Sequence, residues 1–482
     1  MSFTEFCCRS GGSNLNAGTR TGNSTEPGTG ADLTYASGNW VASTGVFTPA
    51  SGDPVADGVA VGDFASVYAD GATVTGFVGR VTARTTTTIT VSLTAKAGTA
   101  PTDGTGTRTL KIGGAWQGPN GSSGFPFTLD FANATNSSSH LPRINFKNDA
   151  DYSITANIAN ATTYTVLQGY TTSYGDGGKA VLKSPNNATS FTLLTINQDG
   201  TSIVDSIFKE NGNAGALHGL QLGGPPNRVK VFRCVAHSIR GNGFHVSWPF
   251  DGRPLLVECE AYDCNGSNTS NFGGFYADNS TMTCIRCISH DNTQHGFSHL
   301  SGQARLLILI NCISDTNTGV GIFGFTDNAH VIINCDLYNN TSHGISLGSL
   351  GATSYIENCN FIKNGGWGIN RANNFPAIIR NNAFGSGTQA NTSGKISSTV
   401  SLIETGTIDY PSDAIPYVDA PNGDFSITLA EAKNAGRGAY TQTQSGYAGT
   451  VGYPDIGAAQ SQCTGGGGGG VRMVNIRGGV DQ

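Results

Sequence analysis

The chain has 482 residues, of which 68 are glycine and 12% are charged, and it carries a formal net charge of −6 with a pI near 5.8. Proteins that bind nucleic acid usually present a basic face, so this acidic balance argues against a nucleic-acid partner. No run of about 18 apolar residues occurs, which argues against a transmembrane helix and predicts no insertion into a membrane.

The chain begins MSFTEFCCRSGG, without a charged n-region or an apolar h-region. A conventional secretory signal is therefore not expected. We predict that the protein is made in a cytoplasm and reaches a virion or the cell exterior by a route that does not use a signal peptide.

Residues 28–113 contain two short segments in which apolar and polar residues alternate, Phe77–Thr82 and Thr88–Leu93. A threonine-rich turn separates them, which is typical of an antiparallel hairpin. We predict a small β-barrel or sandwich here, inserted as a docking or decorating domain.

Six cysteines recur through the central region at intervals of 25, 28, 25, 23 and 24 residues, each inside a short β-branched run that ends in a turn. A unit of two or three short strands cannot bury its own apolar side, whereas stacked units can, so the spacing predicts a solenoid. Free cysteine is among the most buried residue types, and we interpret these six as a buried ladder and not as disulfides. The ladder consists of Cys234, Cys259, Cys287, Cys312, Cys335 and Cys359.

The pairing of the other cysteines stays open. They are Cys7, Cys8, Cys264, Cys284 and Cys463. Cys264 and Cys284 fall in adjoining repeats and could meet. Cys284 and Cys287 have the spacing of half a zinc site, but no second pair of ligands matches it. We predict no metal and no cofactor.

Three further rows of residues follow the same repeat. Asparagines five or six residues after five of the six cysteines suit a turn with left-handed backbone geometry and side-chain-to-backbone bonds. Histidines directly before a glycine are interpreted as surface turn residues. Charged residues directly before three successive cysteines are expected to pair between neighbouring repeats. The rows are Asn265, Asn292, Asn317, Asn340 and Asn364; His218, His295 and His343; and Arg233, Glu258 and Arg286.

The C-terminus combines a glycine-rich linker, residues 463–470, with a short alternating segment, residues 471–482. Such a tethered strand can pair with the sheet edge of another subunit, which predicts a homo-oligomer or filament. A frayed chain end is the alternative. The residues expected to mediate assembly are Val471, Met473, Val474 and Ile476.

The stacked repeats resemble the right-handed parallel β-helix superfamily, which includes pectate lyases, polysaccharide depolymerases and phage tailspikes. PYVDAPNGDFSITLAEAKNAGRGA and PDIGAAQ look like the closing segment of such proteins, and SGGSNLNAGT looks like their opening motif. The strand that normally follows the opening motif begins only at Ser123. The resemblance implies an all-β fold: a right-handed, single-stranded parallel β-helix over residues 114–462, opened by residues 1–27 and interrupted by the inserted domain.

Candidate catalytic residues lie three and four positions after the ladder cysteines. If the repeats stack in register, vertical neighbours lie about 4.8 Å apart. Two carboxylates beside a histidine can serve as general acid and base in glycoside hydrolysis or uronate lysis, and repulsion between them raises one pKa. The alternative is that these side chains cap turns or pair on a wet surface. The candidates are Asp263, His290, Asp291 and Asp315.

Aromatic residues near the repeating glycines are candidate glycan-binding groups, because exposed rings can stack on sugar faces. Period-two alternation places about half of such rings in the core. The candidates are Trp248, Tyr276, Phe325 and Trp367.

Two interpretations of function follow. In the first, the protein is a structural and recognition module, such as a self-associating fibre or a virion tail fibre or spike, whose β-helix arm contacts a polysaccharide or cell-surface glycan. In the second, it is a polysaccharide lyase or glycoside hydrolase acting in a groove on the β-helix. The sequence contains no motif for a nucleophilic serine or a zinc hydrolase. It also lacks the acidic calcium cluster of the pectate lyases, which argues against lyase activity.

Overall fold

The computed structural model describes residues 2–9, 31–70, 72, 77–98, 100–113, 140–154, 157–160, 165–184, 191–197, 199–210, 218–223, 228–247, 252–264, 273–300, 305–325, 329–348, 353–371, 376–397, 402–411, 413–422 and 424–427. Within these ranges the regular elements are β-strands and two short 3-10 helices, η2 (Gly387–Gln389) and η3 (Ala420–Asn422). No helix in this part of the chain is long and apolar enough to cross a membrane.

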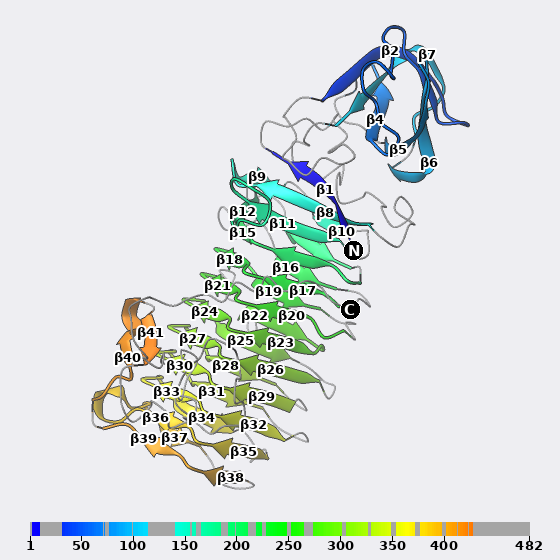
Figure 1. The fold of residues 1–482 in the computed structure, drawn as a ribbon. Coiled ribbons are helices and arrows are strands. Elements are labelled where there is room, and N and C mark those ends of the chain that lie inside the picture. The colour runs from blue at the N-terminus through cyan, green and yellow to red at the C-terminus, as the bar shows by residue number, and fades with distance from the viewer. Residues whose placement is uncertain are drawn as a thin grey trace.

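Three parallel β-sheets run the length of a solenoid, each gaining one strand per turn, or rung (Figure 1). Sheet 1 contains β1 (Ser2–Cys8), β8 (His140–Lys147), β11 (Val166–Tyr170), β14 (Ser202–Val204), β17 (Lys230–Phe232), β20 (Leu255–Val257), β23 (Met282–Ile285), β26 (Leu306–Ile310), β29 (Ala329–Ile333), β32 (Ser354–Glu357), β35 (Ala377–Arg380) and β38 (Leu402–Thr405).

Sheet 2 contains β9 (Tyr152–Ser153), β12 (Ala180–Ser184), β15 (Ser206–Glu210), β18 (Val235–His237), β21 (Glu260–Tyr262), β24 (Ile288–His290), β27 (Ile313–Asp315), β30 (Asp336–Tyr338), β33 (Asn360–Ile362), β36 (Ala383–Phe384) and β39 (Ile408–Asp409). Sheet 3 contains β10 (Ile158–Asn160), β13 (Leu194–Ile196), β16 (His218–Leu222), β19 (Asn242–Val246), β22 (Gly273–Asp278), β25 (His295–Leu300), β28 (Ile322–Gly324), β31 (Ile345–Leu347), β34 (Trp367–Arg371) and β37 (Gly394–Ile396). The predicted all-β parallel solenoid is confirmed.

The register of the strands places like side chains above one another in the interior. Phe244, Phe275 and Phe297 stack in sheet 3 with ring centroids 4.9 and 4.8 Å apart. All six ladder cysteines are at most 1% exposed and free, so their interpretation as small buried side chains is confirmed. Cys264 and Cys284 are not joined by a disulfide: Cys264 follows sheet 2, whereas Cys284 lies in β23 of sheet 1. The expectation that these two could meet was wrong.

The asparagine row is a ladder of buried side-chain amides, and its predicted side-chain-to-backbone bonds are confirmed. Asn317 Nδ2 donates to Asn340 Oδ1 at 3.0 Å, and Asn340 Nδ2 donates to Ser314 O at 3.0 Å. The prediction of left-handed geometry at these positions was wrong. The positive φ angles belong to the residue before the ladder asparagine, such as Asn339 (φ 53°), and to the residue before each ladder cysteine, such as Asn334 (φ 52°). Asn265 lies outside the described residues.

The inserted domain is a closed antiparallel barrel, which confirms the predicted small β domain. Its strand order is β2 (Leu33–Val41), β3 (Val46–Thr48), β6 (Ile89–Gly98), β5 (Phe77–Arg84), β4 (Phe64–Ala69) and β7 (Gly104–Ile112). Because β1 pairs with β8, the barrel is inserted between the first two strands of sheet 1. Phe64 of the barrel packs edge-on against Phe6 of β1 at 4.9 Å, so the barrel covers one end of the solenoid core (Figure 1).

A C-terminal hairpin lies against the outer face of sheet 2. It consists of β40 (Tyr417–Asp419), η3 and β41 (Asp424–Ile427), drawn in orange beside β30 and β33 in Figure 1. Tyr417, Ala420 and Phe425 form a buried cluster with outward residues of sheet 2. The predicted glycine linker, the assembly residues Val471, Met473, Val474 and Ile476, and Cys463 lie outside the described residues.

Candidate functional site

The candidate catalytic residues lie at the end of sheet 2, where its strands bend toward sheet 3. Alternation along each strand turns the middle residue inward and the last residue outward. The pairing of the strands places these last residues one above another in a single row. We call this row the outward column: Lys209, His237, Tyr262, His290, Asp315 and Tyr338.

Three rings of the outward column stack face to face. His237 lies 4.9 Å from Tyr262 with an interplanar angle of 2°, and Tyr262 lies 5.0 Å from His290 with an angle of 16°. Each inner ring face is therefore occupied by its neighbour, and a ligand can approach these stacked faces only at the ring edges. The column offers hydrogen-bonding groups at the spacing of the rungs, about 4.8 Å.

His290 is fixed by two carboxylates. Its Nε2 lies 3.1 Å from Glu260 Oε1, and its Nδ1 lies 2.8 Å from Asp291 Oδ2. Burial opposes the charge on the imidazole, but these carboxylates outweigh it and raise the pKa of His290 to about 9. Both ring nitrogens then donate protons, so His290 holds the carboxylates in place and has no free lone pair with which to act as a base.

Asp315 is the carboxyl group of the column, and its pKa lies close to neutral pH. It lies opposite His290 in the strand pairing between adjoining rungs and is 8% exposed. Burial raises the pKa of Asp315 to about 6, although a hydrogen bond from Thr316 and the charge of His290 both favour the ionised form. A carboxyl group with such a pKa can exchange a proton near neutral pH.

The other predicted acids occupy the bend after the column. Asp263 and Asp291 have φ angles of 50° and 51°, so they occupy the left-handed positions of their rungs. Asp263 Oδ2 accepts a hydrogen bond from Ser238 Oγ at 2.9 Å. The structure thus brings His290, Asp291 and Asp315 together, with Asp263 one rung away from Asp291.

Glu260 is a site residue that was not predicted. The hydrogen bond to His290 lowers its pKa, which keeps it charged. It follows Cys259 directly and lies two residues before Tyr262, so strand alternation alone places it on the same outer face. The sequence therefore contained the signal for Glu260 in its position directly after a ladder cysteine.

The three described glycan-binding candidates, Tyr276, Phe325 and Trp367, lie away from the outward column. Tyr276 is 5% exposed and stacks on His245 at 5.1 Å, so it lacks the exposed ring face that sugar stacking requires. Phe325, after β28, is 45% exposed, and Trp367, at the start of β34, is partly buried. Trp248 lies outside the described residues.

The histidine row before the glycines is buried at two of its three positions, so its prediction as surface was wrong there. His218 and His295 are 5% and 8% exposed, and burial lowers the pKa of each to about 4. The Nδ1 of His295 accepts the backbone N–H of Val320 from the next rung at 3.0 Å. His343 is partly exposed and accepts the N–H of Trp367 at 2.8 Å. These neutral imidazoles connect successive rungs.

The charged row before the cysteines pairs between rungs as predicted. Arg286 Nη2 lies 2.7 Å from Glu258 Oε1. Arg233 bonds in the other direction, to Asp205 of the preceding rung at 2.6 Å. These ion pairs connect the bends of successive rungs, and their carboxylates are hydrogen-bonded to arginine.

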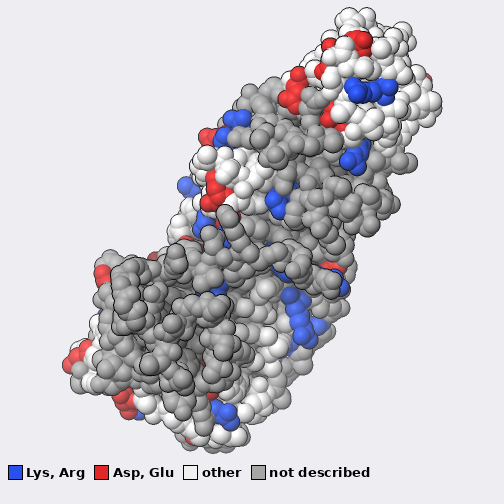
Figure 2. Space-filling model, in the orientation of Figure 1, with Lys and Arg blue, Asp and Glu red and all other residues white. Residues whose placement is uncertain are grey.

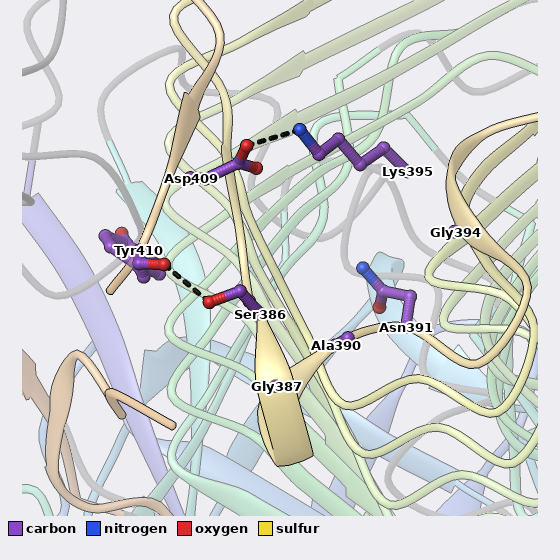
Figure 3. A pocket seen from close by; sticks show the side chains of 9 residues that line it. Ser386, Gly387, Ala390, Asn391, Gly394, Lys395, Asp409 and Tyr410 are labelled. Carbon is purple, nitrogen blue, oxygen red and sulfur yellow. Dashed lines mark hydrogen bonds and ion pairs between the residues drawn. The ribbon is translucent and has the colours of Figure 1, made fainter. Parts of the chain in front are cut away.

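A cavity of about 340 Å³ lies beside the last rungs, apart from the candidate site. Figure 3 shows Lys395 and Asp409 facing each other across it, with Nζ 2.5 Å from Oδ2. Glycine and alanine supply much of the remaining lining. Because its two charged groups neutralise each other, this cavity offers less chemistry than the outward column.

Charged side chains are dispersed over the face drawn in Figure 2. The described Lys and Arg residues lie in separate groups among Asp and Glu, without one continuous basic track. Among the described residues, no group of three or more His, Cys, Asp or Glu side chains is arranged to hold a metal ion.

A sequence profile described as "right handed beta helix region" matches residues 192–347 and 257–400. No curated protein matches the chain. Among solved structures, a pectate lyase is similar over 69% of this chain and 91% of its own, with 14% identity and a TM-score of 0.40. A periplasmic alginate epimerase is similar over 56% and 77%, with 11% identity and a TM-score of 0.30. The A-module of an Azotobacter vinelandii mannuronan C-5 epimerase is similar over 61% and 97%, with 12% identity and a TM-score of 0.23. Likenesses this distant assign no activity to the chain.

Proposed function

We propose that this chain, which matches a right-handed β-helix profile over residues 192–400 and folds as a parallel β-solenoid, is a glycan-recognition protein that presents the outward column of sheet 2 to a polysaccharide or cell-surface glycan. The setting we propose is a virion appendage or another extracellular fibre, where a rigid arm would carry the column to its ligand.

The observation that supports this proposal is the fixed stack of His237, Tyr262 and His290 with its flanking carboxylates. Sugar hydroxyls are recognised by polar groups held at fixed positions, and a preorganised surface avoids the entropy loss of ordering side chains on binding. Here the strand register, the ring stacking and the ion pairs of His290 together hold the polar edges in place.

A second candidate function is supported by Asp315. A polysaccharide lyase or glycoside hydrolase needs a carboxyl group that can donate or accept a proton near neutral pH, and the pKa of Asp315, about 6, suits that task. Glu260 and Asp291 lie beside His290, where their carboxyl groups could stabilise positive charge or accept a proton.

The recognition proposal predicts that Tyr262→Phe weakens glycan binding about tenfold, which corresponds to the loss of one hydrogen bond of about 1.4 kcal/mol. The change removes only the phenolic hydroxyl and keeps the ring in its stack. Binding of the full-length protein is measured on a glycan array and then by titration calorimetry with the glycans that bind.

Tyr355→Phe is the matched control, since Tyr355 is a partly exposed tyrosine on the outer face of sheet 1. Equal effects of the two variants, or no effect of Tyr262→Phe, would contradict the proposal. The same incubations are assayed for new reducing or unsaturated sugar ends. Turnover by the wild type that disappears in Asp315→Asn would establish the enzymatic function instead.

A further inference from the structure

The outer face of sheet 2 is open along one half of its length and covered along the other. Lys209, His237, Tyr262 and His290 are all partly exposed. From the rung after Asp315 onward, the outward residues are closed off: Tyr338 is 3% exposed and Ile362 is 0% exposed. The change from open to covered takes place at Asp315, which is 8% exposed.

The C-terminal hairpin forms this cover. Tyr417 and Phe425 pack edge-on against Tyr338, each with ring centroids 6.0 Å away. Ile362 and Ala383 continue the same buried cluster along the solenoid. The hairpin therefore occupies the face that a ligand would need if it continued along the column past Asp315.

Buried hydrogen bonds attach this cover firmly to sheet 2. Tyr417 donates its hydroxyl to Asp336 Oδ1 at 2.8 Å, and Asn360 Nδ2 donates to the same oxygen at 2.7 Å. Tyr410, just before the hairpin, donates to Asn360 Oδ1. Lifting this segment would break the bonds from Tyr417 to Asp336 and from Tyr410 to Asn360, and both acceptors are 0% exposed. The cover is therefore a fixed wall and not a loose loop.

We propose that this wall makes the outward column a site for the end of a glycan chain. A linear glycan lying along the column can extend over Tyr262, His237 and Lys209, but its terminal sugar must stop at Asp315 against Tyr338 and the hairpin. This inference rests on the proposed glycan recognition and adds its specificity: chain ends are bound, and the interior of a long polymer is not.

The arrangement also assigns roles to individual residues. Asp315 and His290 lie at the closed end, where they meet the terminal sugar, whereas Lys209 lies at the open end, several rungs away. Tyr417 and Phe425 are specificity-determining residues because they hold the wall, although they need not contact the glycan themselves.

The test measures how many protein molecules bind to a fixed mass of polysaccharide as the number of chain ends changes. The probes are a linear uronan, a linear glucan and a linear galactan, each used intact and after limited acid hydrolysis, which multiplies ends at constant sugar mass. Calorimetric titration of the full-length protein gives the number of sites. We expect sites to increase in proportion to chain ends for any probe that binds.

The double variant Tyr417→Ala/Phe425→Ala opens the wall and is expected to give a number of sites set by sugar mass and independent of chain ends. Ile403→Ala is the control, because it removes an exposed apolar side chain from β38 of sheet 1 and should retain the dependence on ends. Should the double variant fail to fold, the wild-type titration alone decides.

The failures of the two proposals are distinguishable. Wild-type binding that follows sugar mass and ignores chain ends overturns the chain-end inference and leaves glycan recognition standing. Absence of binding to every probe and to the glycan array removes glycan recognition, and the inference with it.

Discussion

Acidification from about pH 6.5 to about pH 4 is expected to remove much of the stability of the solenoid, because several buried imidazoles must stay neutral in the folded state. Burial lowers the pKa of His218, His295 and His299 to about 4 and that of His330 to about 3. In the unfolded chain these groups bind protons near pH 6.5. The full stabilisation from neutral imidazoles is therefore present above about pH 6.5. It is lost as the pH falls toward the folded pKa, at a cost of at most about 3 kcal/mol for each imidazole.

Asp315 acts in the opposite direction over this pH range, whereas His290 contributes no change. Asp315, with a folded pKa of about 6, binds its proton more readily in the folded state, so its contribution grows as the pH falls below 6. The pKa of His290 is raised to about 9, so its stabilisation is complete below about pH 6.5 and is lost only as the pH rises through 9. Between about pH 6.5 and 4, the buried neutral histidines dominate.

Thermal unfolding followed by circular dichroism at a series of pH values measures this effect. His245→Phe should flatten the pH dependence, since burial lowers the pKa of His245 well below its usual value and a phenyl ring can keep the stack on Tyr276. His237→Phe is the control: His237 is only half-buried and should leave the slope nearly unchanged. A wild-type melting temperature that stays constant over this range would contradict the expectation.

Asn340→Ala is expected to destabilise the protein by about 3–5 kcal/mol, because it removes a fully buried amide and leaves a cavity. Asn340 Oδ1 accepts from both the backbone N–H and the Nδ2 of Asn317. Its Nδ2 donates to Ser314 O and to Asn364 Oδ1, each at 3.0 Å. The substitution therefore removes hydrogen-bond partners from buried polar groups in the two adjoining rungs.

Asn370→Ala is the matched control, since Asn370 is partly exposed on sheet 3 and makes a single side-chain hydrogen bond to Ser346 at 3.2 Å. It should cost less than about 1 kcal/mol. Both variants are compared with the wild type by urea denaturation. A loss for Asn340→Ala as small as that of the control would show that the amide ladder contributes little.

Much of the fold could be predicted because the same residue types recur at the same position of each rung. The ladder cysteines and the following asparagines face the interior, where each side chain packs against the same residue type in the next rung. The left-handed bends were misplaced for a physical reason. The bends are occupied by different residue types, such as Glu258, Thr316 and Lys363. The regular spacing of the asparagines instead reflects hydrogen bonding between their side-chain amides in successive rungs.

The candidate site could be predicted only in part. Strand alternation and repeat register put His290, Asp291 and Asp315 on neighbouring rungs, and the structure has them there. The cover over Tyr338 could not be deduced, because it depends on a hairpin about 80 residues later in the chain folding back onto sheet 2. The burial that sets the pKa of Asp315 is likewise a tertiary effect that spacing does not encode.

Carboxyl footprinting of the full-length protein, with and without a saturating glycan from the array, tests most directly whether sheet 2 carries the binding surface. Carbodiimide labelling is read by mass spectrometry at Glu260, Asp263 and Asp291, with Glu404 on sheet 1 as an exposed reference. We predict that the glycan protects the first three and leaves Glu404 unchanged. Unchanged labelling at all three sheet 2 acids, in a sample shown to be saturated, would contradict the account.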